Sequence, residues 1–365
     1  MRTFPFYLAV VFALLAAIQT GSSAVAEEPD DENPDGVLSP PRCSWYAQAE
    51  GVALFRNVQR DTIVAYSEQA GADGAFVALK RNDLDDQFTG GGRFTLGHVF
   101  GDSGDSRYSI EMICLWQAPW RATASASDLN SLVNSVPGNL FSSFTDFGYP
   151  PSTKTDYDNF VEIHENSRLG SQEMNLKGAL PSPDWMAMTI LVGARHLTVH
   201  EEFDYLAQPT TSLADPTVFD PSRTPNTVIT HTLNDLWGPQ CGVVMALAPT
   251  PNTWIEAEGK GAICNNGASR DLDATIAGTT YPHDHLFGNA AAYVGEVNVT
   301  AFWRATDAIN VRIGFQAIFI DGLVLACENF NEKLPALTDQ TAKPPLDRRG
   351  RVAYYGPRLG VELHW

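Results

Sequence analysis

Charged side chains that recur at every second position are the residues of this sequence most able to do chemistry. Glu256, Glu258 and Lys260 follow this spacing in one segment, and Glu173 and Lys177 lie four positions apart in another. Side chains two or four positions apart on a β-strand point to the same side of the sheet. On the inner side of a closed sheet, such charges would either pair with one another or line a passage for ions. The predicted pore-lining residues are Glu111, Glu173, Lys177, Glu256, Glu258, Lys260, Glu296, Arg304, Arg312, Arg358 and Glu362, and Glu50, Arg93 and Glu162 belong to the same polar phase.

Other combinations of residues suggest chemistry less strongly. His283 and His285 have a spacing at which two imidazoles bind a metal, but the sequence offers no obvious third ligand. Asp83, Asp85 and Asp86 lack the spacing of an EF-hand, and the chain has no serine-hydrolase, phosphate-loop or zinc-protease motif. A surface protease would need Asp83 or Asp85 to meet one of these histidines, and nothing in the sequence brings them together. We therefore predict that the protein is not an enzyme and has no metal and no cofactor.

The elements that position the charged residues are β-strands. Residues 352–365 alternate between apolar and polar side chains and end on Trp365, as the last strand of a bacterial outer-membrane barrel does. Residues 293–304 and 309–319 show the same alternation around a turn at Thr306-Asp307, which predicts a hairpin. An ordinary strand of a soluble sandwich would also alternate, so the remaining segments have to decide between the two.

The remaining segments predict a single antiparallel transmembrane β-barrel of about ten strands. The other predicted strands are 45–55, 92–100, 107–117, 159–178, 186–200, 237–247 and 253–264. Short connections (101–106, 179–185, 248–252 and 305–307) alternate with long ones (56–91, 118–158, 201–236, 265–290 and 321–351). Outer-membrane barrels have short periplasmic turns and long external loops in this order. A further hairpin, Thr62 to Tyr66 with Ala75 to Leu79, would raise the number of strands to twelve.

Aromatic residues support a membrane location. Amphipathic rings collect where the bilayer meets water, whereas a soluble sandwich would bury tryptophan in the middle of its strands. The predicted topology puts Trp45, Trp303 and Trp365 at the periplasmic rim and Trp116, Trp237, Tyr293 and Phe319 at the external rim, all facing outward. We therefore expect the lipid bilayer of the outer membrane to be the principal partner of this chain.

The N-terminus and the composition agree with a location in the outer membrane. Arg2, an apolar core from Leu8 to Ile18 and Ala24-Val25-Ala26 predict a secretory signal peptide at residues 1–26, followed by a disordered acidic lead-in at 27–42 and the barrel at 43–365. Removal of the signal takes away one base, so the formal net charge moves from −19 to −20. This charge repels phosphate and argues against nucleic acid as a partner. Of the five cysteines, at least one must stay unpaired.

Four short motifs resemble those of a known family. They are Glu173-Met174-Asn175-Leu176 (E-x-N-L), Gly193 to Leu197 (G-x-R-Y-L), Asn234 to Gly242 (N-D-L-x-G-x-Q-x-G), and Arg312 to Gln316 (R-x-G-Y-Q) with Asp321-Gly322 after it. In this order they are similar to the β-barrel porin family numbered seven, outer-membrane proteins of planctomycete-type bacteria. The resemblance spans roughly Cys43 to Trp365 and departs from the pattern at His196 and Cys241. It implies an outer-membrane barrel and carries over no active site and no substrate.

These observations lead to one expected function and two alternatives. The leading expectation is a narrow porin for passive diffusion of small solutes, with a weak cation preference, because about ten strands leave little free space inside. The first alternative is a structural or adhesive barrel with a plugged lumen and functional external loops. The second is a soluble secreted β-sandwich, against which the outward apolar residues argue. In either membrane form, the C-terminal strand is expected to be recognised by the barrel-assembly machinery.

Overall fold

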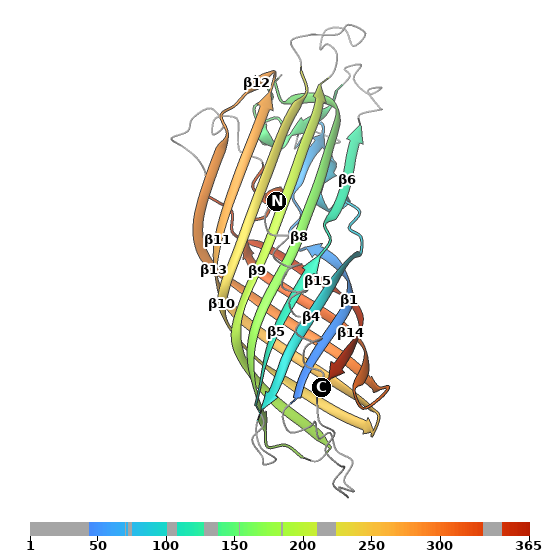
Figure 1. The fold of residues 1–365 in the computed structure, drawn as a ribbon. Coiled ribbons are helices and arrows are strands. Elements are labelled where there is room, and N and C mark those ends of the chain that lie inside the picture. The colour runs from blue at the N-terminus through green and yellow to red at the C-terminus, as the bar shows by residue number, and fades with distance from the viewer. Residues whose placement is uncertain are drawn as a thin grey trace, which may run out of the picture. The chain divides into compact units, whose positions relative to one another are not determined.

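Ten strands form a closed antiparallel ring within the residues that the computed structural model describes, namely 44–69, 71, 75–100, 108–127, 138–152, 154–183, 185–209, 224–330 and 345–365 (Figure 1). The ring consists of β1 (Ser44–Val58), β4 (Thr89–Phe100), β5 (Tyr108–Gln117), β8 (Asp156–Leu180), β9 (Met186–Pro209), β10 (Asn226–Thr250), β11 (Thr253–Ile276), β13 (Asp284–Arg304), β14 (Ile309–Leu323) and β15 (Gly350–His364). Each strand pairs with its neighbour in this order, and β15 pairs with β1 to close the ring. The predicted all-β barrel of ten strands is confirmed.

The ring closes at the end that carries the short turns. The backbone amide of Trp45 donates to the carbonyl of Trp365 at 2.9 Å, and the amide of Trp365 donates back at 3.1 Å. The predicted hairpin of the twelve-strand alternative exists as β2 (Ile63–Ser67) and β3 (Val77–Lys80), but β2 continues to β7 (Leu140–Ser142) and not into the ring. The predicted signal peptide, the lead-in and Cys43 lie outside the described residues.

Six strands continue beyond the ring as a curved sheet, which we call the extension. β8 to β11 hold 24 or 25 residues each, whereas a tilted strand needs only about 9 to 11 residues to cross a bilayer. β6 (Trp120–Ser127) follows β5 after Ala118-Pro119 and pairs with the upper part of β8. The upper half of β13 completes the extension. Short elements sit among these strands: β12 (Thr279–Thr280), η1 (Arg81–Asp83), η2 (Ser143–Thr145) and η3 (Ala326–Glu328).

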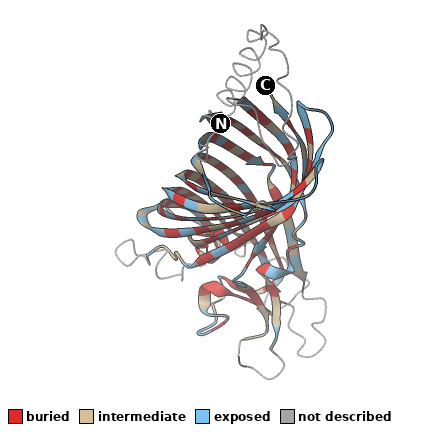
Figure 2. Cartoon of the chain, turned by 90° about the horizontal axis from the view of Figure 1, so that it is seen from below, coloured by how far each residue is buried: buried red, intermediate tan, exposed pale blue. Residues whose placement is uncertain are grey.

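Polarity reverses along each long strand, which explains why the predicted strands were too short. On β9, Ile190 and Val192 face outward and Arg195 is buried inside, but farther along Phe203 is buried inside while Glu202 faces outward. Figure 2 shows the alternation of buried and exposed residues continuing along the strands. The extension is thus polar outside and mainly apolar inside, apart from buried ion pairs such as Arg81–Glu165 and Arg270–Asp284. A strand predicted from apolar residues on its outer face therefore ends where the membrane band ends, although the strand itself continues.

This reversal corrects the predicted loops. Most of 201–236 and 265–290 is strand, and the connection between β11 and β13 covers only 277–283. The predicted loop 118–158 contains β6, β7, η2 and the start of β8, so it is partly wall; its residues 128–137 lie outside the described residues. In the described part of the chain, no helix is long and apolar enough to span a membrane. Cys114, Cys241, Cys264 and Cys327 are free thiols.

Candidate functional site

The charged residues inside the ring form one connected network, which we call the plug. At its centre, Lys260 of β11 lies 2.9 Å from Glu173 of β8, 3.1 Å from Glu258 and 3.2 Å from Glu296 of β13. Arg195 of β9 lies 2.5 Å from Glu296 and 3.4 Å from Glu173. Apart from Glu258, whose side chain is 13 % exposed, these side chains are at most 4 % exposed. Because β8 and β11, like β9 and β13, are not neighbours in the ring, these contacts cross the lumen.

A second part of the plug lies where the ring closes. Glu50 of β1 accepts a hydrogen bond from Arg93 of β4 at 2.9 Å, and it lies 3.5 Å from Arg358 and 3.7 Å from Arg312. Arg312 also lies 3.6 Å from Glu362 and stacks over the ring of Phe302. Three arginines therefore surround one buried carboxylate. Such an arrangement is stable only because further acidic and polar groups neutralise the remaining charge.

The other predicted pore-lining residues lie at different places. Lys177 bonds to Glu111 at 2.9 Å and is 4.0 Å from Glu258, so both belong to the plug. Glu256 accepts a hydrogen bond from the Trp254 indole at 3.1 Å. Arg304 is exposed at the periplasmic end, away from the lumen.

The assignment of Glu162 to the inner polar phase, made from the sequence, is wrong. It lies on the outer face of the extension, between the buried Val161 and Ile163. The alternation is the same as in the ring, but at this level the inside of the sheet is apolar and its outside is polar. A charged residue at this height therefore faces water on the outside.

The seven predicted interface aromatics all face outward. Trp45, Trp116, Trp237, Tyr293, Trp303, Phe319 and Trp365 are between 45 and 57 % exposed. Large apolar side chains of the same outer surface lie between the two rims, among them Ile263, Val297 and Phe315. A closed ring with an apolar, aromatic-edged outer band and a polar inside is the arrangement of outer-membrane β-barrels. This chain is an outer-membrane β-barrel on that evidence.

Several polar residues of the four motifs belong to the plug. Gln240 donates to Glu173 at 2.9 Å, Gln316 donates to Glu296 at 3.1 Å, and Asn175 donates to Glu111 at 3.1 Å. Asn234 precedes the predicted strand 237–247, but in the structure it lies within β10. There its side-chain amide donates to the Val324 carbonyl and its side-chain oxygen accepts from the Val324 amide, each at 2.8 Å.

The glycines of the motifs make room for close contacts between strands. A Cβ added to Gly193 would come within 2.2 Å of the Met174 carbonyl oxygen, and one added to Gly238 within 2.0 Å of the Ile263 carbonyl oxygen. The motifs, each of which is weak by itself, therefore contribute residues to the interior of the same barrel.

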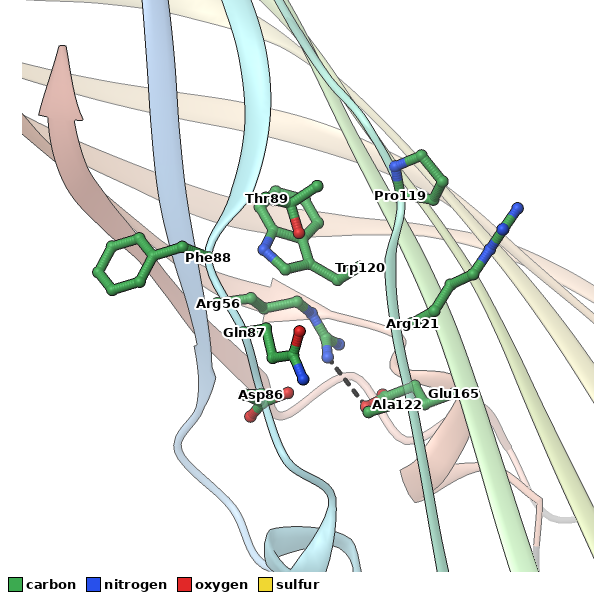
Figure 3. Close-up of a pocket in the computed structure, with 10 residues that line it drawn as sticks. All are labelled: Arg56, Asp86, Gln87, Phe88, Thr89, Pro119, Trp120, Arg121, Ala122 and Glu165. Carbon is green, nitrogen blue, oxygen red and sulfur yellow. Dashed lines mark ion pairs between the residues drawn. The ribbon is translucent and has the colours of Figure 1, made fainter.

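A polar pocket of about 150 Å³ opens in the wall above the ring, between β6 and the segment that leads into β4 (Figure 3). Its lining includes Arg56, Gln87, Trp120 and Glu165. Arg56 lies 3.0 Å from Glu165 and also pairs with the buried Glu201. Burial would raise the pKa of Glu165, but the guanidinium groups of Arg56 and Arg81 outweigh it and lower that pKa. The pocket thus borders a buried ion-pair cluster that sequence reasoning missed, because its members come from distant segments.

The histidines singled out from the sequence have partners that the spacing did not reveal. His285 Nδ1 lies 2.7 Å from Asp271 Oδ1, and His283 lies 2.9 Å from Asp273 and 3.2 Å from Asp271. The acidic partners of the two imidazoles are therefore Asp271 and Asp273, and not Asp83 or Asp85. Among the described residues, no group of three or more histidine, cysteine, aspartate or glutamate side chains is arranged to hold a metal ion.

Comparisons with known proteins find similarity only at the level of structure. No family model matches the chain, and no curated protein matches it by sequence. The outer membrane protease OmpT from Escherichia coli is 9 % identical, with 88 % of this chain and 97 % of that chain covered and a TM-score of 0.42.

Two toluene transporters are also similar in structure. TbuX of Ralstonia pickettii is 12 % identical (91 % of each chain, TM-score 0.30), and TodX of Pseudomonas putida is 7 % identical (89 % and 90 %, TM-score 0.31). Identities this low transfer no function, so the role of this chain has to follow from its own residues.

Proposed function

We propose that the protein is a non-enzymatic outer-membrane barrel whose lumen is closed by the plug and whose extension mediates its contacts outside the cell. The observation that carries this proposal is the set of ion pairs across the lumen, above all Arg195 with Glu296 and Lys260 with Glu173. Ions that are buried and paired this way cannot leave their partners without a large desolvation penalty. A passage through the ring would require such a pair to separate.

A weakly cation-favouring passage for small solutes is the second candidate, and one observation favours it. Seven glutamates face six bases inside the ring: Glu50, Glu111, Glu173, Glu256, Glu258, Glu296 and Glu362 against Arg93, Lys177, Arg195, Lys260, Arg312 and Arg358. The excess of one negative charge matches a weak preference for cations, provided that a rearrangement opens the plug.

Single-channel conductance of the refolded mature protein in a planar bilayer distinguishes the two candidates. A closed barrel gives no conductance steps, whereas the double variant Arg195→Ala/Glu296→Ala, which removes the strongest contact across the lumen, gives discrete steps. Val297→Ala on the outer face of β13 is the matched control and stays silent.

Steps in the unchanged protein that reverse at a cation-shifted potential would instead establish the porin. In that case charge reversal at Glu256, Glu258 or Glu296 should shift the ion preference. Silence of the double variant would show that the Arg195–Glu296 pair is not the barrier.

Two further expectations stay proposals. Membership in the porin family numbered seven is supported by the way its motif residues join one interior network. Recognition of the C-terminal strand by the assembly machinery is supported by the outward, exposed positions of Leu359, Leu363 and Trp365. Deletion of Trp365 tests the second, because it should lower the amount of barrel in the membrane without changing the amount synthesised.

A further inference from the structure

Histidine gathers on one surface of this molecule. The chain has eight histidines, and six of them gather on one outer surface: His164, His200, His231, His283 and His285 on the outer face of the extension, and His196 at its lower edge, stacked on Trp237 of the aromatic rim. Only His98 and His364 lie elsewhere, near the periplasmic end. We call this outer side of β6, β8 to β11 and the upper part of β13 the histidine face.

Carboxylates alternate with these histidines across the strands. His231 of β10 is paired in register with Glu202 on one side and with Asp271 on the other, and Asp271 is paired with His285. On β8, His164 is paired in register with Asp204 of β9. Its Nδ1 also shares a hydrogen bond of 2.9 Å with the hydroxyl of Thr123 on β6. Directly opposite residues on adjacent strands are close enough for their charges to interact.

The charge of this face depends on protonation. Six carboxylates point outward, from Glu162, Glu202, Asp204, Asp235, Asp271 and Asp273, against two guanidinium groups, from Arg121 and Arg168. Six acids against two bases give a formal charge of −4 when the histidines are neutral, and six added protons bring it to +2. Histidine ordinarily titrates near pH 6.5, so the change of sign falls in the mildly acidic range.

Local contacts move the pKa values of two of these histidines in opposite directions. The hydrogen bond to Asp273 raises the pKa of His283, whereas burial and the nearby Arg168 lower the pKa of His200. Burial would raise the pKa of Asp271, but hydrogen bonds from His285 and His283 lower it, so this carboxylate stays charged while the histidines gain protons. Burial and Glu202 raise the pKa of Asp204.

The dimensions of the face suit a macromolecule. Six strands spaced about 4.8 Å apart and about ten residues of strand height give an area on the order of 800 Å², which is what one partner contributes to a standard protein interface. Of the outward-facing residues of this surface, only Arg121 lines the polar pocket described above. An acidic surface of this size matches a broad, positively charged surface by complementarity of charge.

We propose that the histidine face is a docking surface for a lysine- or arginine-rich polypeptide, which it holds at neutral pH and releases at mildly acidic pH. This proposal deepens the role given above to the extension and rests on it. It is tested by binding and not by conductance, so a conducting lumen would overturn the plug and leave this surface in place.

The test measures binding of a fluorescent 20-residue oligolysine to the detergent-solubilised mature protein at pH 7.5 and pH 5.5, at the same low ionic strength. We expect the affinity to fall at least tenfold between the two pH values. Asp271→Asn/Asp273→Asn should weaken binding at pH 7.5 at least threefold. The variant with His164, His231, His283 and His285 all changed to Gln should bind as tightly as the unchanged protein at pH 7.5 and keep most of that affinity at pH 5.5.

The control variant is His98→Gln, which removes a histidine at the periplasmic end and should keep the full pH dependence. Heat-modifiable migration shows that each variant has folded before binding is measured. Two results would overturn the proposal: unchanged affinity in the Asp271→Asn/Asp273→Asn variant, or wild-type pH dependence in the four-histidine variant. Either would mean that oligolysine binds acidic residues outside the histidine face.

Discussion

Arg195 on β9 and Glu296 on β13 meet at 2.5 Å across the inside of the ring, although two whole strands, β10 and β11, lie between them in the wall. Both side chains are almost completely buried. The contact spans 101 residues of sequence and connects two strands that are not neighbours in the wall. It therefore ties the closure of the passage to the stability of the barrel.

Removing both members of this pair should destabilise the barrel by less than the sum of the two single removals. In Glu296→Gln or Arg195→Met, the remaining charge stays buried with one partner fewer, and we expect a loss of up to about 3–5 kcal/mol of unfolding free energy. In the double variant the losses should not add, with a coupling energy of about 1–3 kcal/mol. Urea unfolding followed by heat-modifiable migration measures all three. Additive losses would show that the two residues act independently.

Gly238 should not tolerate a methyl group, whereas Gly261 should. A Cβ at Gly238 would lie 2.0 Å from the backbone oxygen of Ile263, which cannot move without disturbing β11, while a Cβ at Gly261 meets nothing within 4 Å. We expect Gly238→Ala to lose roughly 2 kcal/mol or more of stability and Gly261→Ala to change it by less than about 0.5 kcal/mol. Refolding yield and urea midpoints check both, and equal behaviour of the two variants would contradict the close contact.

The height of the membrane band can be tested on a single strand. Val297 and Asn289 both face outward on β13, the first between the aromatic rims and the second in the extension. Val297→Arg should destabilise the folded barrel in lipid by about 2–4 kcal/mol, because it puts a charge near the middle of the bilayer. Asn289→Arg, the matched control, should have an effect below about 0.5 kcal/mol. Similar losses in the two variants would place the bilayer elsewhere.

Glu328 should make the extension less stable as the pH rises. Burial raises the pKa of this carboxyl from 4.5 to about 7, and Arg60 only partly compensates. Because the folded-state pKa lies above the unfolded one, the folded segment is most stable below about pH 4.5 and loses stability as the pH rises through 7.

The isosteric Glu328→Gln removes this dependence. We expect it to stabilise residues 324–330 by about 2 kcal/mol at pH 8 and to have little effect at pH 5. Hydrogen exchange of these backbone amides at both pH values is the measurement. A gain of protection over the unchanged protein that is equal at pH 5 and pH 8, or no gain at either pH, would contradict the titration of Glu328.

The sequence by itself determined the ring. Alternation of side chains is a local property, because successive residues of a strand point to opposite sides, so the outward positions of Val297, Trp303 and Leu363 and the inward positions of Glu173 and Lys260 followed from counting. The order of short and long connections then gave ten strands, with Trp45 and Trp365 at the same end.

Only the tertiary structure decided which solvent, lipid or water, each side of the sheet faces along the length of a strand. It alone also decided which charged side chains meet. The same alternation runs through β9 from Ile190 to Phe203, but its apolar side turns from outside to inside once the strand leaves the bilayer, because the solvent around the sheet changes from lipid to water. Pairing of Arg195 with Glu296, and the row formed by His231, Asp271 and His285, depend on ring closure and strand register. Neither is encoded in the spacing of any one segment.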